Sequence, residues 1–164
     1  MSYDYPFAGL RVLDLSQGYA GPYCAALLSL YGAEVIKVEP AAGDWARGLG
    51  PTYGDQTAIS LAANRGKKSI VLDLKSEGGR AVARDLAARS DVFIEGFRPG
   101  VCARFGLSYD DVRTLNPGVI YLAVSGYGHQ GPYADRPCTD TVAQAFSGLM
   151  SINSGGDGVP HRVG

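Results

Sequence analysis

The sequence predicts an α/β fold with a mostly parallel sheet and flanking helices. Two observations carry this prediction. Short apolar runs rich in Val, Ile and Leu alternate along the chain with segments of helical character, a pattern that is typical of strand–helix–strand crossovers. The 23 glycines stand mostly at the ends of those runs, where they separate one element from the next. A chain of 164 residues is long enough to bury the core of one such domain.

The first crossover is predicted near the N-terminus. The segment LRVLDLS at 10–16 is expected to be a buried strand, 21–32 a helix and EVIKVEP at 34–40 a second strand. Pro22 suits the first position of that helix, and Gly32 suits the position just after its end. The two strands are therefore expected to lie parallel in a right-handed crossover.

The same pattern recurs in the rest of the chain. Ser76 is expected to cap a helix that carries Val82 and Leu86 on its inner stripe, and Ser108 with Asp111 predicts a capping box at the start of another. Further strands are predicted at 68–74, 91–97 and 119–126, and further helices at 76–90, 108–118 and 139–152.

Ligands of parallel α/β sheets bind at the carboxyl ends of the strands. The Gly- and Pro-rich segment 41–67 is predicted to be a loop that wraps such a site. The turn SQGYAGP at 16–22 places Tyr19 and Ala20 at the end of the first strand, next to the free N–H groups of a helix start. The turn is thus a candidate cradle for a phosphate or an amide-rich chain, and a simple connector is an equally supported interpretation.

Cations also follow the predicted strands. Lys75 and Arg98 come directly after apolar runs, so both are expected at the ligand-facing edge. Phe97 can present its ring to a base, with Arg98 or Arg104 pairing a phosphate. Taken one at a time, the cations Lys37, Lys67, Lys68, Lys75, Arg98 and Arg104 are each best interpreted as solvated surface residues.

Three other features are disfavoured as sites. GYGHQG at 126–131 matches a dinucleotide-binding glycine pattern, but Pro132 and a predicted loop follow where a helix is needed. Cys138 has neither histidine at a spacing that implies a dyad, so it is interpreted as a buried, unactivated cysteine. Asp140 is interpreted as a helix-capping acid rather than as a catalytic group.

The composition excludes several classes of function. A net charge of −1 gives no basic surplus for nucleic acid or anionic lipid. Three widely spaced cysteines (Cys24, Cys102 and Cys138), none in a CxxC pattern, predict neither a disulfide framework nor a metal site. The first ten residues do not have the pattern of a signal peptide, and no apolar stretch is long enough to span a bilayer. A cytoplasmic protein is therefore expected.

Four stretches together resemble class III CoA-transferases of the CaiB/BaiF type. They are LRVLDLSQGYAGPYCAALLSLYGAEVIKVEP, NRGKKSIVLDLKSEGGR, DVFIEGFRPGVCARFGLSYDDVRTLNPGVIYLAVSGYGHQGP and DTVAQAFSGLM. The resemblance runs through nearly the whole chain in the family's order, and it covers the amino-terminal part of a family member. It implies that residues 1–164 are the CoA-binding, Rossmann-like portion of an incomplete large domain.

The resemblance also implies where coenzyme A binds. Tyr19 and Ala20 match positions that line CoA, the segment LDLK ends in Lys75, and Arg104 matches a phosphate-binding arginine. Pro40 stands where a well-known member has an arginine, so one cation of the CoA site is absent. The implied CoA-binding residues are Tyr19, Ala20, Leu72, Asp73, Lys75, Gly96, Phe97, Arg98 and Arg104.

The implied activity is the transfer of CoA from an acyl-CoA to a carboxylic acid through an aspartyl intermediate. The family's aspartate nucleophile is expected beyond Gly164, so no turnover is expected from residues 1–164 alone. The family's racemases carry an acid/base histidine where this chain has Thr139, whose hydroxyl cannot shuttle a proton near neutral pH. The resemblance further implies an interlocked homodimer and no metal. A non-catalytic CoA-binding or dimerisation module, a racemase and a nucleotide-dependent oxidoreductase remain the alternatives.

Overall fold

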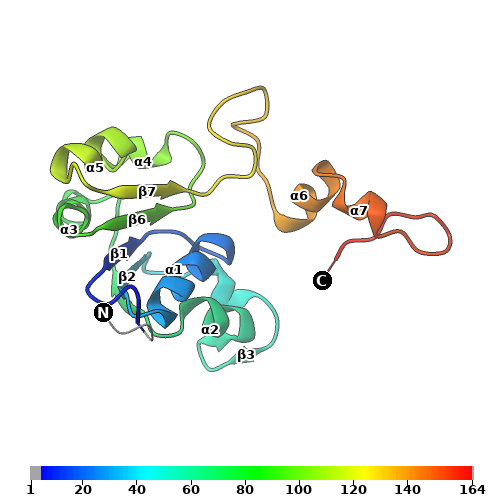
Figure 1. Ribbon diagram of the computed structural model, residues 1–164, viewed down its shortest axis with the longest axis horizontal. Coiled ribbons are helices and arrows are strands. Elements are labelled where there is room, and N and C mark those ends of the chain that lie inside the picture. The colour runs from blue at the N-terminus through cyan, green and yellow to red at the C-terminus, as the bar shows by residue number, and fades with distance from the viewer. Residues whose placement is uncertain (1–4, 164) are drawn as a thin grey trace. The chain divides into compact units, whose positions relative to one another are not determined.

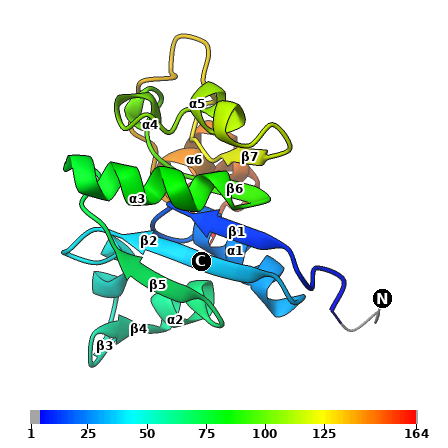
Figure 2. The same ribbon diagram turned by 90° about the vertical axis from the view of Figure 1, so that its left-hand side faces the viewer.

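The sheet is parallel throughout and lies in the first of two compact units. The computed structural model describes residues 5–163, which divide into these units between Val124 and Ser125. The first unit holds a five-stranded sheet whose neighbours all pair in parallel, in the order β5-β2-β1-β6-β7 (Figure 2). Its strands are β1 (Arg11–Asp14), β2 (Glu34–Glu39), β5 (Lys68–Val71), β6 (Val92–Glu95) and β7 (Ile120–Ala123). The predicted fold class and all five predicted strands are confirmed.

The strand order reverses direction once. From β1 the chain moves through β2 to β5, then returns to the other side of β1 with β6 and β7. The reversal therefore lies between β1 and β6, and the loops after these two strands diverge there. Such a switch point at the carboxyl edge is where open α/β sheets bind their ligands.

Helices cover both faces of this sheet. They are α1 (Ala20–Leu30), α2 (Ala58–Asn64), α3 (Glu77–Ala88), α4 (Val101–Arg104) and α5 (Tyr109–Leu115). Alternate residues of β1 enter two separate cores, because successive side chains of a strand point to opposite faces. Val12 packs in one core with Ala25 of α1, and Leu13 packs in the other with Ala83 of α3. Figure 1 shows α1 on one side of the sheet, with α3 and α5 on the other.

Most of the predicted helix signals are confirmed. Ser76 accepts a hydrogen bond from the N–H of Gly79 (3.0 Å), and Ser108 with Asp111 forms the capping box of α5. Gly32 follows the end of α1 with φ +102°, a conformation that favours glycine. Two details are wrong. The helix begins at Ala20, so Pro22 is its third residue rather than its first, and Val82 is 42% exposed. Ala83 and Ala87 form the inner stripe of α3, because small side chains let it approach the sheet closely.

The segment 41–67 is not the unstructured loop that its glycines and proline predict. It contains the 3₁₀ turn η1 (Trp45–Gly48), the antiparallel pair β3 (Thr52–Tyr53) and β4 (Gln56–Thr57), and α2. These elements are too short to show apolar periodicity, and polar contacts define them instead. Thr57, for example, caps α2 in a box with Ser60 and donates to the carbonyl of Ala46 (2.7 Å).

The second unit contains α6 (Asp140–Phe146) and α7 (Leu149–Ile152). A single helix is predicted over 139–152, but Gly148 adopts φ +82° and interrupts it. Residues 125–139 contain no helix, which confirms that GYGHQG lacks the structural context of a dinucleotide site. Within residues 5–163, no helix has the length and apolar character needed to cross a membrane.

Candidate functional site

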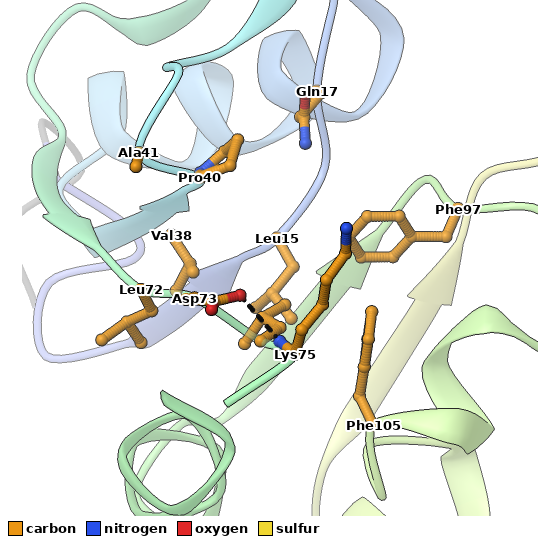
Figure 3. A pocket seen from close by; sticks show the side chains of 11 residues that line it. Leu15, Gln17, Val38, Pro40, Ala41, Leu72, Asp73, Lys75, Phe97 and Phe105 are labelled. Carbon is orange, nitrogen blue, oxygen red and sulfur yellow. Dashed lines mark hydrogen bonds between the residues drawn. The ribbon is translucent and has the colours of Figure 1, made fainter. Parts of the chain in front are cut away.

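A cavity opens at the carboxyl edge of the sheet in the first unit. It has a volume of about 270 Å³ and collects residues that follow β1, β2, β5 and β6 (Figure 3). Its lining residues are Leu15, Gln17, Val38, Pro40, Ala41, Leu72, Asp73, Leu74, Lys75, Phe97 and Phe105. The cavity thus lies where the strand order predicts a ligand site.

The lining is mostly apolar with a few polar groups. Phe97 and Phe105 meet edge to face, with ring centroids 6.1 Å apart. Asp73 accepts a hydrogen bond from the backbone N–H of Lys75 (2.9 Å), which fixes the turn after β5. Gln17 and the ammonium of Lys75 supply donors at the rim. Such a lining suits a ligand that has a planar apolar part and an anionic or amide-rich part.

The structure brings together four of the nine predicted site residues. Leu72, Asp73, Lys75 and Phe97 all line the cavity. The other five lie on the connections after β1 and β6, outside the lining. Tyr19 precedes α1 and stacks on Tyr23 (5.2 Å), Ala20 opens α1, and Gly96, Arg98 and Arg104 lie exposed between β6 and the end of α4.

Several lining residues were not predicted from the sequence. Leu15 and Val38 lie in predicted strands, so only their place at the strand ends could have singled them out. Gln17 lies within the predicted turn 16–22, in which only Tyr19 and Ala20 were singled out as site residues. Phe105 follows α4, a helix of four residues bounded by Gly100 and Gly106, both at positive φ. So short a helix has no periodicity that a sequence could reveal.

Two lysines interpreted as surface residues are buried. Lys37 is 1% exposed; its ammonium lies 2.8 Å from Oδ2 of Asp44 and donates to the carbonyl of Ser16 (2.7 Å). The ammonium of Lys67 is equally enclosed and donates to Asp14 (2.8 Å) and to the carbonyl of Pro22 (2.7 Å). The surface interpretation is therefore wrong for both. Burial lowers the pKa of Lys67, and the charge of Asp14 opposes that shift.

A third buried carboxylate connects to this network. Glu39 accepts two hydrogen bonds from the guanidinium of Arg47 (2.8 and 2.9 Å), one from Ser69 and one from the N–H of Asp44. Burial alone would raise the pKa of the Glu39 carboxyl, but these bonds outweigh it and lower that pKa to about 2. These hydrogen bonds connect segment 41–67 to β2 and, through Glu39, to Ser69 of β5.

The buried thiol of Cys102 is not activated. Burial, together with the nearby charge of Glu95, raises the pKa of the Cys102 thiol to about 12, far from the range of a nucleophile. Cys138 is partly buried rather than buried, and its thiol contacts the carbonyl of Thr139 at 3.6 Å. Among residues 5–163, no three His, Cys, Asp or Glu side chains are grouped to hold a metal ion.

Comparison with known families gives a match over nearly the whole chain. Residues 7–164 match the profile of CoA-transferase family III. The chain is 46% identical over 160 residues to the acetyl-CoA:oxalate CoA-transferase of Acetobacter aceti, covering 97% of this chain and 41% of that protein. It is 43% identical over 161 residues to human succinyl-CoA:glutarate CoA-transferase, covering 97% of this chain and 37% of that protein.

Solved structures agree with these matches. A CaiB/BaiF family protein from Brucella suis superposes with a TM-score of 0.91 at 39% identity, over 98% of this chain and 44% of that one. Rv3272 from Mycobacterium tuberculosis superposes with a TM-score of 0.86 at 40% identity, over 97% of this chain and 44% of that one. The chain thus spans about two fifths of the length of these relatives.

Proposed function

The chain belongs to CoA-transferase family III, and we propose that residues 1–164 are the CoA-binding part of such an enzyme. The observation that carries this proposal is the cavity at the switch point. Four residues that the family resemblance assigns to CoA (Leu72, Asp73, Lys75 and Phe97) converge on it from two separate strand ends.

The chemistry of the cavity fits the two ends of CoA. The ring of Phe97 offers a face for the adenine, since planar rings stack on aromatic side chains. Lys75, Arg98 and Arg104 lie on the same edge and supply cations for the phosphates. The turn containing Tyr19 and Ala20 offers polar backbone groups to the amide-rich arm of the carrier.

We infer that the reaction exchanges CoA between short carboxylic acids. The relatives are named for acetyl-CoA and oxalate and for succinyl-CoA and glutarate. In the proposed course, an aspartate outside residues 1–164 attacks the thioester carbonyl, which releases CoA thiolate and leaves a mixed anhydride. The thiolate then attacks the aspartyl carbonyl and expels the donor acid. The acceptor carboxylate repeats the exchange in reverse, which regenerates the aspartate.

The residue at position 139 supports the proposal of transfer rather than racemisation. Thr139, at the position of the racemase histidine, precedes α6 and makes no side-chain capping bond. A threonine hydroxyl titrates far above neutral pH, so it cannot alternate as acid and base at the α-carbon.

We also propose that the complete enzyme is an interlocked homodimer. Apolar and aromatic residues recur on the outer side of α1 at helical spacing and are each 39–49% exposed: Tyr19, Tyr23, Leu27 and Leu30. Exposed apolar stripes of this kind commonly mark interfaces.

The test is an acyl-exchange assay with isotopically labelled CoA. It compares the 164-residue chain with a chain that continues through the expected aspartate, while retention on immobilised CoA and on NAD is measured in parallel. We expect both chains to bind CoA and not NAD, and only the longer one to exchange it. Equal exchange by both would contradict the placement of the nucleophile. CoA binding without exchange by either would favour a non-catalytic module.

A further inference from the structure

The buried ion pair of Lys37 and Asp44 forms hydrogen bonds with the backbone of the turn after β1. Oδ1 of Asp44 accepts hydrogen bonds from the backbone N–H of Gly18 (2.9 Å) and of Ala46 (2.9 Å). Its other oxygen pairs with Lys37, which in turn donates to the carbonyl of Ser16. One carboxylate and one ammonium therefore fix the backbone on both sides of Gln17.

Gln17 is the residue of this turn that lines the cavity. The ion pair itself does not reach the ligand space, because Lys37 and Asp44 are 1% and 2% exposed and neither is among the lining residues. Gly18 adopts φ +83°, a conformation that its neighbours must maintain. Gln17 thus points into the cavity from a backbone whose two flanking polar groups are both satisfied by buried charges.

A contribution to folding stability alone does not explain why Lys37 and Asp44 form a buried ion pair. Replacing a buried ion pair by apolar residues is often neutral or stabilising, since both charges lose their hydration. What such replacement removes is the fixed geometry of the bonded groups. Here those groups are the carbonyl of Ser16 and the N–H of Gly18, the two immediate neighbours of Gln17.

We propose that Asp44, with Lys37 as its buried counter-ion, is a positioning residue that presets Gln17 and the turn between β1 and α1 for the bound carrier. The inference rests on the proposed function, because the carrier is taken to be CoA. The hydrogen bond from Gly18 to Asp44 is the essential contact, whereas the charge of the pair and the bond from Lys37 to Ser16 are dispensable.

Two double variants separate geometry from charge. Lys37→Met/Asp44→Asn removes both charges and keeps an acceptor for Gly18 and Ala46, whereas Lys37→Met/Asp44→Leu removes the acceptor as well. We expect the CoA affinity of Lys37→Met/Asp44→Asn (the asparagine pair) to lie within about threefold of that of the parent chain. The CoA affinity of Lys37→Met/Asp44→Leu (the leucine pair) should be about tenfold weaker. Val112→Ala, which truncates the buried side chain of α5, is the control for lost stability and should leave the CoA affinity unchanged.

A double-mutant cycle with Gln17→Ala tests the route of the effect. If the ion pair acts through Gln17, the loss in the leucine pair should largely disappear when Gln17 is already alanine. Equal losses in both double variants, no loss in either, or a full loss on the Gln17→Ala background would each overturn the proposal. Lys37→Met/Asp44→Ala replaces the leucine pair if that variant does not fold.

Amide hydrogen exchange of Gly18, measured without ligand, distinguishes failure of this inference from failure of the proposed function. We expect Gly18 to be protected in the parent and in the asparagine pair, and to exchange at least tenfold faster in the leucine pair. Absence of CoA binding by the parent would refute the proposed function, and this exchange would still decide whether the turn is held. Unchanged protection in the leucine pair would refute the inference.

Discussion

At the scale of single residues, Glu39 connects three parts of the chain around the site through its buried carboxylate. It receives hydrogen bonds from Arg47, Ser69 and Asp44, and so joins β2, β5 and segment 41–67. Its carboxyl is 3% exposed, which makes each of these bonds more valuable than it would be in water.

The lowered pKa of Glu39 makes stability depend on pH in a defined window. The carboxyl titrates near 2 in the folded chain instead of at its usual 4.5. The stabilisation is complete above pH 4.5 and is lost as the pH falls towards 2. It amounts to about 3 kcal/mol if all of the shift contributes. We expect Glu39→Gln to flatten the pH dependence of the free energy of unfolding between pH 4.5 and 2.5, as measured by urea denaturation.

Glu34→Gln is the matched control for that titration. Glu34 pairs with Lys68 at the surface, where ion pairs contribute little. An identical slope in the parent and in Glu39→Gln would show that the Glu39 contacts do not lower its pKa.

The buried lysines show what a sequence cannot reveal at this scale. Lys37 lies in a strand, but its partner Asp44 comes from the following segment, and Lys67 pairs with Asp14 from 53 positions away. Charged residues are rarely buried without a partner, so each of them alone indicates solvent exposure. These lysines are buried because each forms an ion pair with a carboxylate, and the two partners of each pair come together only when the sheet forms.

At the scale of elements, the first turn of α3 contains two adjacent glycines in different surroundings. A Cβ at Gly78 would meet no atom within 4 Å, whereas a Cβ at Gly79 would overlap the carbonyl oxygen of Asp73. Only Gly79 is therefore required by packing, because it lets the helix start approach the turn that lines the cavity.

We expect alanine substitutions at these two glycines to change the free energy of unfolding in opposite directions. Gly78→Ala should stabilise the chain by about 0.5–1 kcal/mol, because alanine has the higher helix propensity. Gly79→Ala should destabilise it by about 1–3 kcal/mol and displace Asp73, since the overlapping atom belongs to the backbone. Urea denaturation of both variants measures the difference. A stabilising Gly79→Ala would contradict the close approach of α3 to Asp73.

The elements that could be predicted are those with internal signals. Apolar runs predict all five strands of the sheet, and Ser76 and Ser108 mark the starts of α3 and α5. Segment 41–67 and α4 were missed, because their short elements are set by contacts with the rest of the unit. Seven of the eleven lining residues were not among the predicted site residues. Phe105 was missed for the same reason as α4, because it belongs to the site only through its packing against Phe97.

At the scale of the whole molecule, the two units differ in how they bury apolar surface. The first has two apolar cores, one on each face of its sheet. In the second, Gln144 is the only buried residue among those described, while Phe146 and Ile152 are 61% and 83% exposed. A segment that buries so little apolar surface gains little stability from its own contacts. We therefore expect the first unit to dominate cooperative unfolding of this chain.

The central claim is that the carboxyl edge of this sheet binds CoA. Calorimetric titration of the 164-residue chain with CoA tests it most directly, with Lys75→Ala as the test variant and Lys68→Ala, an exposed lysine at the opposite end of β5, as the matched control. The account predicts measurable CoA binding that weakens about five- to tenfold in Lys75→Ala and is unchanged in Lys68→Ala. No affinity for CoA, or equal binding by all three proteins, would contradict it.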